Sequence, residues 1–167
     1  MISKTMEETL NQQINAELHS SYIYLSMSAY FESVNLRGFA NWMRVQAQEE
    51  LVHVCKFYNY LVERDGRVLL DAIDAPPTKW DSPLDTFEAA FKHEQKISGK
   101  INDLMDLALK EKDHATANFL QFFISEQVEE EATAKGVVDQ LKMIGDAKAG
   151  LFMMDRELGA RTFAPEA

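Results

Sequence analysis

The chain has 167 residues, of which 46% are hydrophobic and 26% are charged, a size and balance that fit one domain with a sizeable core. It contains only seven Gly and four Pro, about half of the roughly 12% average usage, which disfavours a turn-rich all-β fold. Seventeen Lys and Arg oppose 27 Asp and Glu, and the net charge of −10 makes nucleic acid a poor partner.

The compartment is indicated by what the sequence lacks. No run approaches the ~18 apolar residues of a membrane span, and residues 1–8 have no apolar core of a secretory signal. The single cysteine, Cys55, excludes an internal disulfide and any cysteine-pair metal site. We therefore expect a cytoplasmic protein with no membrane partner.

The first half of the chain contains two predicted helices. One extends from Thr5 to about Val34, where apolar residues recur at steps of three and four; these are Ile14, Leu18, Tyr22, Leu25 and Ala29. After a short break at 35–38, a second helix extends from about Phe39 to Arg64, with apolar positions at Trp42, Val45, Leu51, Val54 and Leu61. It ends at Asp65-Gly66, where Gly suits the C′ position.

A long loop, 67–81, separates the two halves, and its apolar residues 68–70 predict packing against another surface, such as a neighbouring subunit. The next helix begins with Ser82 as N-cap and Pro83 at N1. This helix extends from Pro83 to about Lys110. Two more helices are predicted after it, from about Ala115 to Ile144 and from about Asp146 to Leu158.

The connection lengths predict the topology. Short turns make the first two helices one antiparallel hairpin and the next two a second hairpin. The middle loop can span ~50 Å at ~3.3 Å per residue, more than the ~40 Å length of a 26-residue helix, so it can cross the whole bundle. We expect an all-α fold in which residues 1–145 form a four-helix bundle with one long crossover loop, and residues 146–167 form a short fifth helix and tail.

An offset of 77 residues aligns the two hairpins as copies. It matches two sets of three polar side chains, Glu17, Glu50 and His53 with Glu94, Gln127 and Glu130. In each set the second and third members lie 33 and 36 residues after the first, which antiparallel pairing brings to one level. Apolar neighbours place this level inside the bundle, where carboxylates need a cation. Oxygen ligands with one nitrogen suit Fe(II), Mn(II) or Zn(II), and ligand type does not choose among them.

Other ionisable residues fit the metal pattern less well. A second Glu-x-x-His sequence, Glu111 to His114, falls on a turn and has no matching partners, so we interpret it as coincidence. His19 and His93 follow and precede the key glutamates on other helical faces. We expect both to be solvated surface residues.

The segments that carry these residues resemble the bacterial and archaeal non-haem ferritins from end to end. The resemblance lies in residues 13–17 (QINAE), 38–43 (GFANWM), 48–53 (QEELVH), Pro76-Pro77 with Trp80, and 126–131 (EQVEEE). It implies a ferritin-like four-helix bundle, a ferroxidase that oxidises Fe(II) with dioxygen or hydrogen peroxide, and iron storage in a hollow homo-oligomeric shell of twenty-four subunits.

The resemblance also implies a set of iron ligands. One iron would be held by Glu17, Glu50 and His53. The second would be held by Glu50, Glu94 and Glu130, with Gln127 nearby and Glu50 as the bridge. Tyr24 matches the family's tyrosine beside the centre, and the sequence leaves open whether it is a core residue or a redox participant.

Differences from related families indicate which cofactors this chain can bind. Haem-binding relatives carry Glu-x-x-His in both halves and a methionine before the first histidine, whereas this chain has Gln127-x-x-Glu130 and Val52. We therefore expect no haem. The neutral Gln127 predicts weaker ligation of one iron, so iron should pass through the centre.

Three acids remain once the first two irons are assigned, and they predict a third iron site; they are Glu49, Glu126 and Glu129. Glu126, Glu129 and Glu130 share one helical face, and Glu49 is the matching acid of the other hairpin. Non-haem ferritins imply a site formed by Glu49, Glu126, Glu129 and the shared Glu130. The alternative is a solvated acidic face.

The fifth helix predicts assembly. Its apolar stripe contains Ala147, Leu151, Met154 and Leu158, and Phe152 and Met153 widen it beyond what one bundle needs.

The alternatives to storage are a permanent di-iron oxygenase or peroxidase, and a non-catalytic helical scaffold whose polar level specifies the fold.

Overall fold

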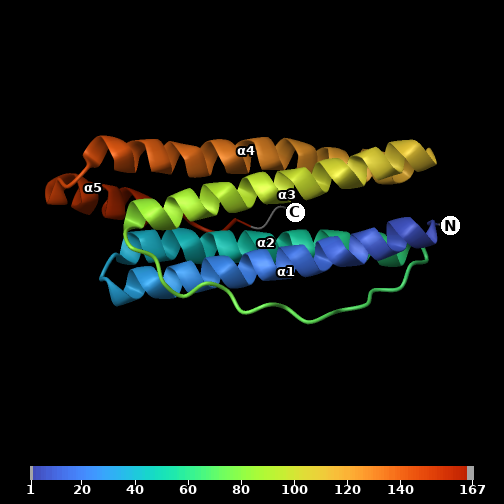
Figure 1. The fold of residues 1–167 in the computed structure, drawn as a ribbon, viewed down its shortest axis with the longest axis horizontal. Coiled ribbons are helices and arrows are strands. Elements are labelled where there is room, and N and C mark those ends of the chain that lie inside the picture. The colour runs from blue at the N-terminus through green and yellow to red at the C-terminus, as the bar shows by residue number, and fades with distance from the viewer. Residues whose placement is uncertain (1, 165–167) are drawn as a thin grey trace.

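The computed structural model describes residues 2–164, which form five helices and no strand. The helices are α1 (Lys4–Ser33), α2 (Arg37–Glu63), α3 (Pro83–Glu111), α4 (His114–Ile144) and α5 (Lys148–Leu158). The loop after α2 runs the length of the bundle, so α2 and α3 point in the same direction (Figure 1). The predicted four-helix bundle with one crossover and a short fifth helix is confirmed.

The second hairpin begins and turns as its sequence predicts. Ser82 Oγ accepts a hydrogen bond from Asp85 N at 3.0 Å, and Pro83 occupies the first turn of α3. Lys112 turns the chain in the left-handed region with φ 58°. The side chain of Asp113 then caps α4 by accepting a hydrogen bond from Thr116 N at 3.1 Å. Local capping chemistry therefore defines this hairpin.

The end of α2 differs from the prediction. Asp65, with φ 59°, takes the left-handed C′ position that we assigned to Gly66. Gly66 is one residue further on, where its N–H donates to Leu61 O at 2.9 Å. This is the second bond of a Schellman motif. A Cβ on Gly66 would lie 2.4 Å from Leu61 Cδ1, so glycine is needed here for close approach and not for its φ.

The start of α2 receives its cap from α5. Leu36, the N-cap residue, makes no side-chain hydrogen bond. Asp155 instead accepts hydrogen bonds from Gly38 N at 2.8 Å and Phe39 N at 3.1 Å. A Cβ on Gly38 would lie 1.5 Å from the Asp155 carbonyl oxygen. Gly38 is therefore what allows α5 to dock on α2.

The crossover loop lies on α1. Asn11 holds it through two hydrogen bonds, donating to Arg67 O at 2.9 Å and accepting from Leu69 N at 2.7 Å. Val68 packs against the bundle's own core, whereas the side chains of Leu69 and Leu70 are exposed. The predicted packing is thus satisfied within the subunit by Val68, and Leu69 and Leu70 remain available for a neighbour.

The helical period of α1 was predicted correctly, but its buried face was not. Tyr22 and Leu25 lie outside the core, with 47% and 51% of their surface exposed. Leu51 of α2 is likewise exposed. The reason is that the inward face of α1 carries polar residues at the middle of the bundle, including Glu17 and Ser20. An apolar stripe therefore points to the wrong side at that level.

The core consists of two apolar clusters separated by this polar level. One cluster, towards the α1–α2 turn, contains Phe31, Phe39 and Phe87, and the other contains Leu10 and Phe57. The buried polar side chains come from all four long helices, between the residues of the two clusters; they include Gln13, Glu17, Glu50, His53, Glu94, Gln127 and Glu130. No helix within residues 2–164 has the length and hydropathy needed to span a bilayer.

Candidate metal centre

The first hairpin contributes a compact group of three ligand-type side chains. Glu17 of α1 and Glu50 and His53 of α2 each offer a ligand atom, and these atoms lie within 4.8 Å of one another. His53 Nδ1 is 3.8 Å from Glu17 Oε2 and 3.4 Å from Glu50 Oε2. All three residues are buried, with no more than 5% of their surface exposed. Their spacing in the sequence therefore does bring them together.

The second hairpin contributes the matching residues. Glu94 of α3 and Gln127 and Glu130 of α4 are buried at the same level. Gln127 Nε2 donates to Glu94 Oε2 at 3.1 Å, and the Tyr24 hydroxyl donates to Glu94 Oε1. Tyr24 is thus a buried residue of α1 that contacts a proposed ligand on α3.

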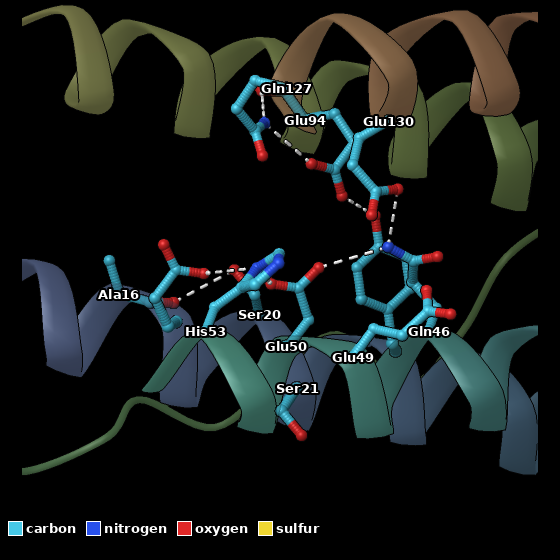
Figure 2. A network of polar contacts seen from close by, with 12 residues as sticks. Ala16, Ser20, Ser21, Gln46, Glu49, Glu50, His53, Glu94, Gln127 and Glu130 are labelled. Carbon is cyan, nitrogen blue, oxygen red and sulfur yellow. Dashed lines mark hydrogen bonds and ion pairs between the residues drawn. The ribbon is translucent and has the colours of Figure 1, made fainter. Parts of the chain in front are cut away.

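Two glutamines that the sequence analysis missed complete the network. Gln46 Nε2 donates to Glu50 Oε1 at 3.3 Å and to Glu130 Oε2 at 2.8 Å, and so links the two hairpins. Gln13 Nε2 donates to Glu17 Oε1 at 2.6 Å. Each glutamine lies four residues before a glutamate of its own helix, a spacing that could have revealed them. Figure 2 shows Glu50 and His53 facing Glu94 and Glu130 across the bundle interior.

Electrostatics in the first hairpin favour an ion pair. Burial alone would lower the pKa of His53, but the nearby Glu17 and Glu50 carboxylates and their negative charge raise it to about 11. Burial tends to raise the pKa of Glu17, but contacts with His53 outweigh it and lower the pKa. Burial dominates at Glu50, whose pKa is raised well above its usual value. Without metal, the His53 imidazolium therefore supplies the positive charge that a metal ion would bring.

The second hairpin has no such cation. Burial raises the pKa of Glu94, and charge from Glu17 adds to this. Burial, with charge from Glu94, raises the pKa of Glu130 to about 7. Burial and the neighbouring glutamates also raise the pKa of Tyr24 well above its usual value. These carboxylates are therefore costly to ionise until a positive charge arrives.

The donor set fits a metal ion. Glu17 Oε2 is buried and accepts no hydrogen bond from the described residues, which is unusual for a carboxylate oxygen. Carboxylate oxygens with one imidazole nitrogen are the ligands of Fe(II), Mn(II) and Zn(II). The layer is built from all four long helices, so folding itself positions the ligands.

The third group of acids is only partly assembled. Glu49 and Glu126 line one cavity of about 90 Å³ that His53 also reaches. Glu129 is exposed on the next turn of α4. Glu49 is an ion-pair partner of Arg161, whose Nη2 lies 2.5 Å from Glu49 Oε2. The sequence analysis did not identify this arginine.

The expectation that His19 and His93 are solvated is wrong. Both are only partly exposed, and His93 Nε2 lies 2.7 Å from Ser20 Oγ, with its ring edge-on to Tyr24. Burial, with charge from His19, lowers the pKa of His93 to about 4. The two histidines come from neighbouring helices, α1 and α3, whose packing covers them.

The other Glu-x-x-His sequence joins no such group. Glu111 accepts a hydrogen bond from Ser3 Oγ at 2.6 Å, and His114 is exposed at the start of α4. Neither belongs to a metal-type cluster among residues 2–164.

Comparison with known proteins identifies the family to which this fold and site belong. The family model described as a ferritin-like domain matches residues 7–144. The chain belongs to the ferritin family. A bacterial non-heme ferritin of Bacteroides fragilis (strain 638R) is 48% identical over 161 residues, which cover 96% of this chain and 100% of the relative. A bacterial non-heme ferritin of Staphylococcus saprophyticus is 40% identical and covers 98% of both chains.

Solved ferritin structures are similar over the same length. An engineered closed form of the Archaeoglobus fulgidus ferritin is 51% identical, with a TM-score of 0.97 over 98% of this chain and 100% of the other. A structure described as an open pore ferritin from Archaeoglobus fulgidus is 52% identical, with a TM-score of 0.96 over 96% of this chain and 98% of the other. The ferritin fold, including the fifth helix, is therefore shared along almost the whole chain.

Proposed function

We propose that this ferritin-family chain stores iron by oxidising Fe(II) at the buried centre and depositing a ferric mineral in a shell. One Fe(II) is held by Glu17, Glu50 and His53. Its neighbour is held by Glu50, Glu94 and Glu130, with Gln127 beside it; these side chains are all buried. The observation that carries the proposal is this layer of four carboxylates around one imidazole, built from four helices.

Metal binding follows from the electrostatics of the buried polar layer. His53 Nδ1 faces both Glu17 and Glu50, so Fe(II) enters by displacing the proton of this nitrogen. A second proton leaves Glu130, whose pKa is about 7. Each cation replaces a proton among carboxylates that burial makes unfavourable to ionise.

The redox step belongs to the iron substrate. Each Fe(II) gives one electron to dioxygen or hydrogen peroxide, and the carboxylates stabilise the higher charge of Fe(III). Tyr24 holds Glu94 through its hydroxyl, which supports a positioning role and leaves open a redox role. Gln127 donates its amide to Glu94, so the second iron has a weaker ligand set and can leave.

A third iron site lies beside the centre in this proposal. Its ligands are Glu49, Glu126, Glu129 and the shared Glu130. The small cavity lined by Glu49, Glu126 and His53 supports it, because it joins the acids to the centre. This site would change the ratio of iron to oxygen consumed without being required for the first oxidation.

A homo-oligomeric shell of twenty-four subunits supplies the storage volume. Exposed apolar side chains support assembly: Phe152 and Met153 of α5 are 64% and 72% exposed, and Leu70 of the crossover loop is 69% exposed. Large apolar side chains exposed in this way favour burial against a neighbouring subunit. Residues 1–145 then form the four-helix bundle with the iron centre, and residues 146–167 form the short fifth helix and tail; residue 1 and residues 165–167 lie outside the described part of the chain.

Aerobic addition of excess Fe(II) to the purified protein tests the function. We expect rapid oxidation and thousands of iron ions retained in a large particle of uniform size. Oxidation without retention would indicate an oxygenase or peroxidase, and neither would indicate a scaffold. Glu50→Ala, compared with the exposed Asp103→Ala, assigns the oxidation to the centre.

A further inference from the structure

The chain after α5 returns along α2 and is held there. We call residues 159–164 the C-terminal strap. Asn41 Nδ2 donates to the carbonyl oxygens of Gly159 at 3.4 Å and Arg161 at 2.9 Å. Because Asp155 also binds the first turn of α2, the strap begins from a fixed point. Its path over α2 is therefore set by specific hydrogen bonds.

Arg161 is the strap's main side-chain contact. Its Nη2 donates to Glu49 Oε2 at 2.5 Å, and its Nη1 donates to Trp42 O at 3.4 Å. The guanidinium carbon also lies 4.4 Å from the centre of the Trp42 ring. The Arg161 and Glu49 side chains are 22% and 29% exposed, so solvent only partly screens the pair. One arginine thus makes an ion pair, a backbone hydrogen bond and a cation–π contact.

The end of the strap covers the cavity between α2 and α4. Phe163 and Ala164 line the same space of about 90 Å³ as Glu49, Glu126 and His53. This volume admits a few water molecules, and therefore a hydrated metal ion. The strap places a cation on one proposed ligand of the third site and two apolar side chains in the wall of the cavity.

We infer that Arg161 and a metal ion compete for Glu49, so that the C-terminal strap controls occupation of the third site. This inference rests on the proposed third site. A guanidinium is permanently charged and only donates hydrogen bonds, so it uses the lone pairs of Glu49 Oε2 that a metal needs. Two cations sharing one carboxylate also repel each other. Arg161 therefore opposes metal at Glu49 and Glu126, and full use of the Glu49 carboxylate by a metal displaces the guanidinium and loosens the strap.

The competition separates the third site from the buried pair. None of the hydrogen bonds and ion pairs of Arg161 involves Glu17, Glu50 or His53, so the strap leaves those ligands in place. The first two ions bind whether or not the strap is closed. The third site fills only at a metal concentration high enough to displace the guanidinium. Arg161 therefore sets the order in which the three sites bind metal.

Zn(II) is a suitable probe because it binds the same ligands without redox chemistry. We would titrate the assembled wild type, Arg161→Gln and Asn41→Ala with Zn(II) by calorimetry, and locate the bound ions by anomalous diffraction. Arg161→Gln should bind Zn(II) at Glu49 and Glu126 about tenfold more tightly, the value of one charge-assisted hydrogen bond. Asn41→Ala, which releases the strap but keeps the charge, should give a smaller gain in the same direction.

A control and an optical readout separate competition from a general charge effect. Arg156→Gln removes an exposed positive charge from α5 and should leave the third-site affinity unchanged. Zn(II) should also change the emission of Trp42, measured in a Trp80→Phe background, as Arg161 leaves its ring. This change should follow filling of the third site and be absent in Arg161→Gln.

Three results would overturn the inference, and the first two concern Arg161 directly. One is equal third-site affinity in wild type and Arg161→Gln, and the other is Zn(II) at Glu49 with Arg161 still in contact. Zn(II) in the buried pair, with Glu49 and Glu126 empty in every variant, would also reject it, while the proposed oxidation centre would stand. Absence of Zn(II) from Glu17, Glu50 and His53 would instead contradict the proposed function.

Discussion

In the first hairpin, Glu17 and Glu50 face the imidazole of His53, whereas in the second hairpin Glu94 faces the amide of Gln127. The two sets occupy equivalent positions in a duplicated pattern and the same level of the bundle. Their pKa values nevertheless move differently. The Glu17 pKa is lowered and the His53 pKa is raised, whereas burial raises the pKa of Glu94 and also that of Glu50 in the first hairpin.

The difference shows what one residue type does in a buried layer. An imidazole can carry a proton and neutralise its neighbouring carboxylates, and it can exchange that proton for a metal. An amide donates and accepts hydrogen bonds but stays neutral, so it cannot supply a positive charge to a carboxylate. The proposed function therefore makes the first hairpin the stronger metal position, and the second, whose Glu94 is held by neutral donors, the position from which iron leaves.

The largest expected effect comes from removing the residue shared by both positions. Glu50→Ala should slow aerobic Fe(II) oxidation by about 100-fold or more, since losing even an outer-shell partner of a metal site costs about 10–100-fold. Stopped-flow measurement of the initial rate tests it, with Asp103→Ala as the exposed control. An unchanged initial rate in Glu50→Ala would contradict the shared position.

Exchanging the hairpins' distinguishing residues tests the comparison directly. His53→Gln should weaken metal binding at the first position by about 10–100-fold, because it removes the only nitrogen ligand of that position. Gln127→His should strengthen the second position and slow the departure of iron from it. Zn(II) titration of the two variants measures both effects, and the comparison fails if the two changes shift affinity in the same direction.

Unfolding of chelator-treated protein should show opposite signs for Glu130 and Glu17. The Glu130 pKa is raised to about 7 in the fold, so the folded state binds its proton more tightly than the unfolded state. Stability from this group is present at low pH and is lost as pH rises from about 4.5 to about 7. At pH 8, Glu130→Gln should therefore increase the free energy of unfolding, by about 1–2 kcal/mol.

Glu17→Gln should do the reverse. The lowered pKa of Glu17 reflects its contacts with the His53 imidazolium, and this stability is present above the usual glutamate pKa and is lost in acid. Its removal at pH 8 should decrease the free energy of unfolding by a similar amount. Denaturant titrations at pH 5 and pH 8 distinguish the two variants, and equal signs at pH 8 would contradict the assignment of charge.

The smallest expected effect concerns the link between the hairpins. Gln46→Met removes the hydrogen bonds to Glu50 and Glu130 while keeping a similar volume. Because the bond from Gln46 lowers the pKa of Glu130, its loss should weaken the second metal by about threefold near pH 7 and leave the first metal unchanged. An equal loss at both positions would show that Gln46 supports the whole layer.

Much of this molecule was predictable because its signals are local or periodic. Ser82 and Pro83 mark the start of α3 by capping chemistry. The 33- and 36-residue spacings predicted that Glu17, Glu50 and His53 would meet, because antiparallel helices joined by a short turn pair residues at equal distances from it. The resemblance to non-haem ferritins gave Glu94 and Glu130 their expected roles.

The tertiary structure decided what local patterns could not. Several contacts cross more than 100 residues, among them Asp155 capping α2 and Arg161 pairing with Glu49. Gln46 bridges the hairpins only because α2 and α4 pack together at one level. The face of α1 that packs inward is polar at the middle of the bundle. The apolar stripe therefore does not coincide with the buried face there, and Tyr22 is exposed. Sequence by itself determined the helices and the ligand spacing, since these depend on backbone chemistry and periodicity; long-range packing determined which faces and partners they met.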